Sequence, residues 1–193
     1  MTFGPGGFLS NMKRKFTTKI INFILNLYGK LFKFDCPFIY NQDEFEYVSI
    51  PFTEDCIVYY IGWSFLYSDM HDELFNKYLR FLGLEYYFPT FIMSLLHEVG
   101  HHKTLGNINN YSKMIDITKY KKLFNINSRK ELDLLIYYNV PDEYEASKWA
   151  IQFANEHVLS LKVLTYILYP LINHCYKHHW SLMIQESKIY TEK

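Results

Sequence analysis

The stretch Phe91–Gly106, FIMSLLHEVGHHKTLG, decides how this sequence is interpreted. An apolar run leads into His97, Glu98 and His101, which together form an H-E-x-x-H pattern. Residues four apart lie on one face of a helix, so His97 and His101 direct their imidazoles to one point. Two imidazoles placed in this way can bind the same Zn²⁺ ion, each with a bond of about 2.0–2.1 Å. The pattern predicts a zinc-binding helix.

Glu98 follows the first histidine directly and turns aside from the metal axis. There a carboxylate can take a proton from a metal-bound water and pass it to a leaving amine. Such a pattern would arise by chance in roughly one of fifty sequences of this composition. The alternative is a pair of histidines that merely satisfy their hydrogen bonds, but the apolar run before His97 favours a buried metal helix.

A catalytic zinc site needs three protein ligands and one open position, so a third ligand must come from another segment. The candidates are Glu143 and Glu145, in the first turn of a helix that we expect to start near residue 141. Alanines recur every four residues along that helix, at Ala146, Ala150 and Ala154. Small residues allow close approach to the motif helix, and Glu143 shares their side of the helix more nearly than Glu145 does.

The two motifs together resemble the ImmA/IrrE family of zinc metallopeptidases, within the gluzincin-like zincins. The family pattern is H-E-x-G-H followed by E-x-x-A-[N/D]-x-[aromatic]-A, over roughly residues 85–156. The matching residues are His97, Glu98, Gly100, His101, Glu143, Ala146, Trp149 and Ala150.

The resemblance implies that His97, His101 and Glu143 are the zinc ligands and that Glu98 is the catalytic base. Ser147 stands where the family usually has Asn or Asp, and this position would orient a ligand by a hydrogen bond. Serine has a shorter reach than either residue, so metal affinity or rate is expected to differ from the family.

The same resemblance implies an α+β fold: a helix-rich, zincin-like metallopeptidase domain with a small sheet and H-E-x-x-H on a central helix. The expected activity is peptide-bond hydrolysis by a zinc-activated water, with a regulatory protein as substrate. By analogy with the family, we expect a cytoplasmic protein of a bacterial or phage-infected cell. The whole chain, 1–193, is expected to form one domain, with its metal-site core at about 85–156.

Composition narrows the class of protein further. The 193 residues carry 20 basic and 20 acidic side chains, a formal net charge of +0, which argues against a nucleic-acid partner. Three widely spaced cysteines, Cys36, Cys56 and Cys175, argue against a disulfide scaffold and favour a reducing compartment. No apolar run reaches the roughly 18 residues that span a bilayer.

The N-terminal third should hold a loose tail over residues 1–12 and an amphipathic helix over 13–34. We expect Leu27 and Leu31 on the apolar side of that helix, and Asn22 and Asn26 on its basic-polar side. The helix is expected to dock on the core, or alternatively on a membrane surface or a partner.

Two short strands are predicted next, Phe45–Ile50 and Cys56–Ile61, as a hairpin. The zincin fold that the resemblance implies has an edge strand that pairs with an extended peptide substrate, and Cys56–Ile61 would supply it. The predicted helix boundaries are a stop at Gly83, an N-cap at Thr90, a stop at Gly106, a capping box at Ser128–Glu131, a start at Pro141 and a break at Pro170.

Several alternatives remain open for the site. Glu145 and His102 are the other ligand candidates, although His102 points off the metal axis at i+5 from His97. His174 and His178 also stand four apart, which would allow a second metal site. Any of 18 tyrosines, or a histidine, could supply an oxyanion donor.

A function of a different class is also open. The zinc would then only staple the fold, and the protein would be a non-catalytic binding or structural protein acting through its N-terminal helix. Glu98 discriminates between the two functions, because a structural zinc site does not need it.

Overall fold

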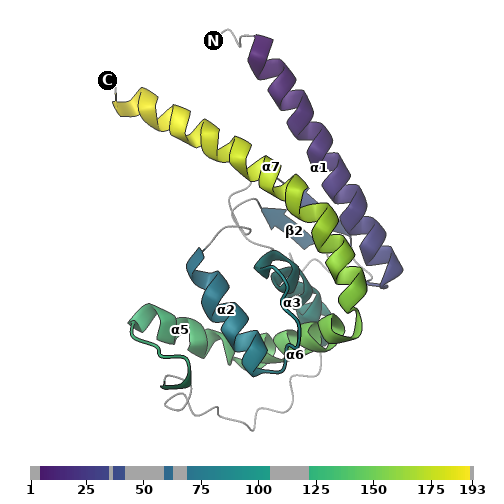
Figure 1. Cartoon of the computed structure of the whole chain (residues 1–193), viewed down its shortest axis with the longest axis vertical. Coiled ribbons are helices and arrows are strands. Elements are labelled where there is room, and N and C mark those ends of the chain that lie inside the picture. Colours follow the sequence, from purple (N-terminus) through teal and green to yellow (C-terminus); the bar gives the residue numbers. More distant parts are fainter. Residues whose placement is uncertain (1–4, 35–36, 42–58, 63–68, 105–121, 192–193) are drawn as a thin grey trace. The chain divides into compact units, whose positions relative to one another are not determined.

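The computed structural model describes residues 5–34, 37–41, 59–62, 69–104 and 122–191. The chain forms two compact units, one from residues 1–67 with 164–193 and the other from 68–163. The described part is helix-rich with one small sheet, as the predicted α+β class requires (Figure 1). A zincin topology and a single domain over 1–193 stay predictions.

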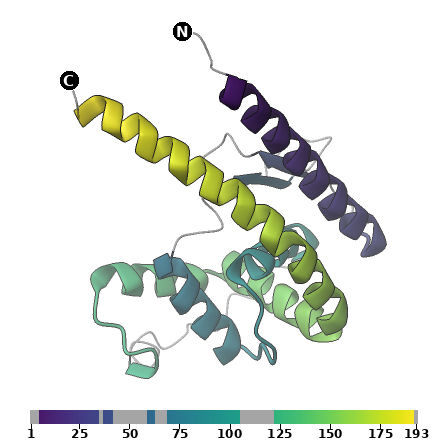
Figure 2. The ribbon, with the colours of Figure 1, turned by 45° about the horizontal axis from the view of Figure 1, so that its top comes forward.

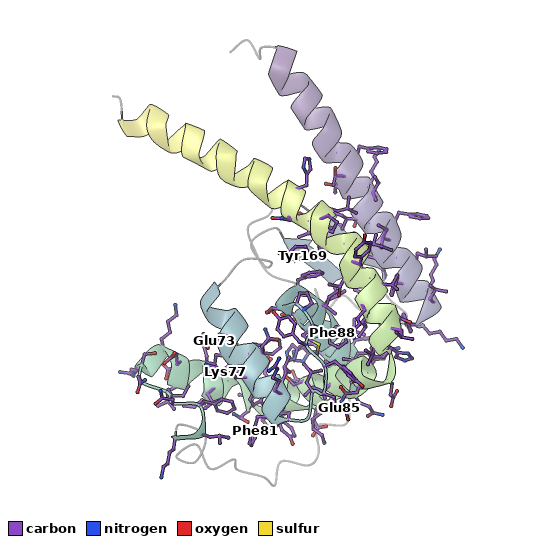
Figure 3. The ribbon with its side chains drawn as sticks, in the orientation of Figure 1. Glu73, Lys77, Phe81, Glu85, Phe88 and Tyr169 are labelled. Carbon is purple, nitrogen blue, oxygen red and sulfur yellow. The ribbon has the colours of Figure 1, made fainter. Side chains whose placement is uncertain are left out.

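The unit of residues 68–163 is helical in its described part (Figure 2). It contains α2 (Asp69–Phe81), α3 (Thr90–Thr104), α5 (Arg129–Tyr138), α6 (Pro141–Glu156) and the first residues of α7 (Val158–Thr191). The most extensive helix contact in this unit is between α3 and α6. On the outer face of α2, Glu73 and Lys77 form an ion pair with 2.5 Å between Oε1 and Nζ (Figure 3).

The core of this unit is aromatic and aliphatic. Phe88 lies in the connection between α2 and α3 and is buried (Figure 3). Tyr78 is fully buried, and its hydroxyl donates to the carbonyl of Tyr138 at 2.7 Å, which links α2 to the end of α5. The other large, fully buried side chains of the unit are Leu79, Ile92, Met93, Leu96, Leu135 and Leu161.

The helix ends follow the local sequence closely. Gly83 has a φ of +114°, and the amides of Gly83 and Leu84 donate to Arg80 and Leu79, which is the hydrogen-bond pattern of a glycine C-cap. The capping box between Ser128 and Glu131 is present at the start of α5. The predicted stop at Gly83, this capping box and the start of α6 at Pro141 are therefore confirmed.

Two other boundary predictions were wrong. Pro89, not Thr90, accepts the first backbone bond of α3, and the Thr90 hydroxyl instead accepts a bond from the Asn76 amide at 2.8 Å. Pro170 does not break α7, because a proline removes only one amide donor and the carbonyl four residues earlier belongs to the exposed Tyr166. The predicted stop at Gly106 lies outside the described residues.

The second unit contains α1 (Pro5–Leu31), β1 (Phe38–Asn41) and β2 (Tyr59–Gly62). The two strands pair in parallel, with Phe38 opposite Tyr59. β2 coincides with the end of the predicted strand Cys56–Ile61, whereas Phe45–Ile50 and the hairpin turn lie outside the described residues. The pairing of β2 with a substrate peptide stays a prediction.

Helix α1 begins at Pro5, inside the stretch that was predicted to be a tail. It packs against β1, which the amides of Asn22 and Asn26 contact, and its Ile21 and Leu25 side chains are buried. The predicted faces of this helix were therefore wrong for the two asparagines, which belong to the packed side. Leu27 is on the exposed side.

Asn22 and Asn26 bind the edge of β1 as a neighbouring strand would. The Asn26 amide accepts from Phe38 N–H at 3.0 Å and donates to Phe38 C=O at 2.8 Å. Asn22 makes the same two bonds to Tyr40, at 2.6 and 3.1 Å. Two side chains one helical turn apart thus satisfy two alternate residues of the strand. Within the described ranges, no helix is long and apolar enough to cross a membrane.

Candidate metal centre

Helix α3 brings His97 and His101 together. The apolar residues that precede His97 are buried and fix this helix inside the unit. His97 is itself buried, and the His97 and His101 rings stand edge to face with centroids 4.6 Å apart. The helical spacing in the sequence therefore produces the predicted pair of imidazoles.

Gly100 and Ala146 allow α3 and α6 to lie very close together. A Cβ atom on Gly100 would lie 2.4 Å from the carbonyl oxygen of Ala146, a distance that no real side chain tolerates. Ala146, Ala150 and Ala154 have no exposed surface. The alanine pattern thus does what the sequence predicted, and the glycine between the two histidines makes the approach sterically feasible.

The close approach places Glu143 of α6 against both histidines. Its Oε2 atom lies 2.9 Å from Nε2 of His97 and 3.6 Å from Nε2 of His101. The ligand atoms of the three residues all lie within 4.8 Å of one another, close enough to hold a metal ion. Two ligands of a tetrahedral zinc ion lie about 3.3 Å apart, so the residues present fit zinc with small adjustments.

The outer nitrogen of each imidazole also has a partner on α6. Nδ1 of His97 lies 3.1 Å from the Ser147 hydroxyl, and Nδ1 of His101 lies 3.3 Å from a carboxylate oxygen of Asp142. These contacts leave both Nε2 atoms directed at Glu143. Such outer partners fix ring orientation and tautomer in metal sites.

Ser147 reaches His97 in spite of its short side chain. It is fully buried on the α6 face that contacts α3, where the close packing makes a longer side chain unnecessary. A hydroxyl can donate or accept, so Ser147 can serve either tautomer of His97, whereas a carboxylate can only accept. The departure from the family pattern at this position therefore preserves the contact.

Two aromatic residues complete the surroundings of the group. The Tyr137 hydroxyl at the end of α5 is hydrogen-bonded to the Glu143 carboxylate. The Phe75 ring of α2 meets His97 edge to face, with centroids 5.8 Å apart. The three residues that could hold a metal ion are thus contacted from α2, α5 and α6.

Charge within the group is balanced by protons on the ligands themselves. Burial raises the pKa of Glu143, but hydrogen bonds from His101 and His97 outweigh it and hold the pKa far below the usual range. Burial lowers the pKa of His97, so this imidazole is neutral near pH 7. Burial also lowers the pKa of His101, but Glu143 outweighs it and raises the pKa to about 9. A proton on His101 therefore supplies the positive charge that a metal ion would bring.

Glu98 shares this electrostatic environment from the next position on α3. Burial raises the pKa of its carboxyl to about 7, and the charge of His101 acts in the opposite direction. A carboxyl whose pKa lies near 7 is suited to take up and release protons at neutral pH.

The other candidates lie outside the three-residue group. Glu145 points to Lys148, 4.0 Å from its Nζ atom, and His102 does not join the group. His174 lies on α7, and the side chain of His178 is outside the described residues.

Sequence reasoning missed two residues. Asp142 stands next to Glu143, but its acidic side chain was explained by the helix start alone. Tyr137 was one tyrosine among 18, with no motif to single it out. Only the fold brings these two side chains to the ligands.

Comparisons with protein-family models, curated proteins and solved structures found no match to this chain.

Proposed function

We propose that this protein is a zinc-dependent metallopeptidase that hydrolyses peptide bonds. One observation carries the proposal: both Nε2 atoms of His97 and His101 converge on Glu143, while both Nδ1 atoms are held by Ser147 and Asp142. Two imidazoles and one carboxylate form a common ligand set of catalytic zinc.

The number of ligands favours catalysis over a structural role. Structural zinc sites are closed by four protein ligands, whereas catalytic sites keep one position open. In the described part of the chain, the group that can hold a metal has three members. When bound, zinc acidifies a water molecule and polarises a carbonyl oxygen.

Glu98 is the residue of this chain that would move the proton. It adjoins His97 on α3 and is partly accessible to solvent. Its carboxyl group interacts electrostatically with His101 and Glu143. As a carboxylate it accepts a proton from the attacking water, and as a carboxylic acid it returns that proton to the leaving amine.

Tyr137 would act at the same centre as a donor. Burial raises the pKa of its phenol, and the hydrogen bond to Glu143 raises it further, so the hydroxyl keeps its proton at all ordinary pH values. Its side chain is about half exposed, so the phenol also reaches solvent at the edge of the group. We propose that it holds the Glu143 carboxylate in position.

The decisive variant is Glu98→Gln, which keeps the size of the side chain and removes the base. We expect zinc content and helix content to stay at the level of the parent, while cleavage of a peptide library by the zinc-loaded protein falls about 10²–10⁴-fold. Glu145→Gln is the matched control, because Glu145 lies outside the group, and it should cleave like the parent.

Cleavage by Glu98→Gln at the parental rate would overturn the assigned mechanism. A zinc-loaded parent that cleaves nothing in the library would instead favour a zinc-stapled binding protein.

A further inference from the structure

The N-terminal segment differs in charge from the rest of the chain. Residues 1–34 contain no acidic side chain, and the first acidic residue is Asp35. Because the whole chain is balanced at 20 basic and 20 acidic residues, the remainder is left with 14 basic and 20 acidic ones. The basic residues of the segment are Lys13, Arg14, Lys15, Lys19, Lys30 and Lys33.

Large apolar side chains lie on the exposed side of α1. Phe16, Phe23, Leu27 and Leu31 are exposed, Phe23 by 69% and Phe16 by 66%. Their spacings of seven, four and four residues place them in one row along the helix. The opposite side of α1 is already used, because it packs on β1.

Two lysines border this row on one side. Lys15, Lys19 and Lys30 are exposed. At 100° per residue Lys19 and Lys30 fall next to the apolar row, whereas Lys15 falls at the angle of Asn22 and Asn26. We call the row and the two lysines beside it the α1 face: Phe16, Lys19, Phe23, Leu27, Lys30 and Leu31. Phenylalanine and leucine beside lysine, without acidic residues, is the composition of helices that lie in the membrane interface.

We propose that the α1 face binds the surface of a membrane that contains anionic phospholipids. The apolar row enters the boundary between headgroups and acyl chains, and the lysines contact the lipid phosphates. A second copy of the chain is the less suitable occupant, because a two-fold interface on this face would bring like-charged lysines together. The inference does not depend on the metal centre.

The test uses the full-length chain and vesicle flotation. We expect the protein to float with vesicles of phosphatidylcholine and phosphatidylglycerol, but not with vesicles of phosphatidylcholine alone, and to lose binding as salt is raised. The double variant Phe23→Ser, Leu27→Ser should lose at least tenfold in affinity. Lys19→Glu, Lys30→Glu should lose more, since each lysine contributes about fivefold near an anionic surface.

Leu159→Ser is the matched control. Leu159 is 80% exposed at the start of α7, so the change removes a similar apolar surface outside the α1 face, and binding should stay at the parental level. Circular dichroism of every variant shows whether the fold is retained. If the variant Phe23→Ser, Leu27→Ser loses helix content, the flotation of Lys19→Glu, Lys30→Glu is the test of the proposal.

Three outcomes would overturn the proposal. The first is no flotation with anionic vesicles, and the second is equal flotation with both vesicle types. The third is a dimer in solution that the Phe23→Ser, Leu27→Ser variant converts to a monomer, which would assign the α1 face to a second copy of this chain.

Discussion

Helices α3 and α1 both carry two polar residues four positions apart within apolar sequence, yet the two pairs do different work. Asn22 and Asn26 of α1 meet the backbone of β1, and each amide both donates and accepts. His97 and His101 of α3 meet a carboxylate, Glu143, and share it. The amides are neutral and their bonds are complete without a ligand.

The spacing of four residues in the sequence is enough to identify such pairs. The role of each pair depends on the group that it contacts in the folded chain. A strand edge offers alternating donors and acceptors, which an amide matches atom for atom. A buried carboxylate offers only acceptors and a negative charge, and two neutral imidazoles cannot balance that charge unless a proton or a metal ion is added. The asparagine pair is therefore structural, whereas the histidine pair belongs to a group that can hold a metal ion.

Asn26→Ala should lower the stability of the fold without affecting zinc binding, and it therefore distinguishes the asparagine pair from the histidine pair most clearly. It leaves the N–H and C=O of the buried Phe38 without their side-chain partner, and each such group costs about 1–3 kcal/mol. We expect the free energy of unfolding to fall by about 2–4 kcal/mol in urea titrations. Zinc affinity should be unchanged, and a loss of zinc in folded Asn26→Ala protein would mean that the pairs are coupled.

Gly100→Ala perturbs the histidine pair through the packing of α3 on α6, without changing a polar side chain. The added methyl group would lie 2.4 Å from a backbone oxygen of α6, so the two helices must separate. We expect a loss of about 1–3 kcal/mol in the free energy of unfolding, as for other overpacked cores. Zinc affinity should fall too, because Glu143 moves with α6. A variant with parental zinc affinity would show that the close approach is not needed for the site.

Ser147→Ala removes one outer partner and leaves the ligands in place. We expect zinc affinity, measured by chelator competition, to fall about tenfold, the lower end of the range for such partners. Ser147→Asn, which introduces the family's usual residue, tests whether the tight contact between α3 and α6 accepts a larger side chain. An unchanged affinity in Ser147→Ala would contradict the orienting role of the hydroxyl.

The metal-free protein should lose stability as pH rises above about 6.5, because below that pH the lowered pKa of the buried His97 acts in the opposite direction. Burial raises the pKa of Glu98 in the folded state to about 7. The contribution of this carboxyl to the free energy of unfolding is therefore fully present below about pH 4.5 and is lost as the pH rises through 7. The pKa of His101 is raised to about 9, so its contribution is full below about 6.5 and is lost as pH rises through 9.

Thermal melting of the chelator-treated protein between pH 5 and 9 measures this loss. Glu98→Gln should flatten the part below pH 7 and keep the part above it. A melting temperature that rises steadily across the whole range would contradict both assignments.

The sequence predicted the local features because each depends on nearby residues. The start of α6 at Pro141, the stop at Gly83 and the capping box at Ser128 are set within a few positions. The grouping of His97, His101 and Glu143 could also be predicted from the sequence, because helical spacing and small residues limit what two helices can bring together.

The remaining features depend on contacts between distant segments. The residues that face β1 on α1 could not be chosen by hydropathy, since Asn22 and Asn26 look like surface residues until a strand edge lies beside them. Tyr137 and Asp142 reach the metal ligands only because α5 and α6 meet at a short turn. No local pattern carries that information.

The metal content of the purified chain tests the central claim most directly. Elemental analysis of the parent, His101→Ala and Asn26→Ala should find about one zinc ion per chain in the parent and in Asn26→Ala, and none in His101→Ala. A parent that stays free of zinc after the metal is added back, or a folded His101→Ala variant that binds zinc as the parent does, would contradict the assignment of His97, His101 and Glu143 as a metal centre.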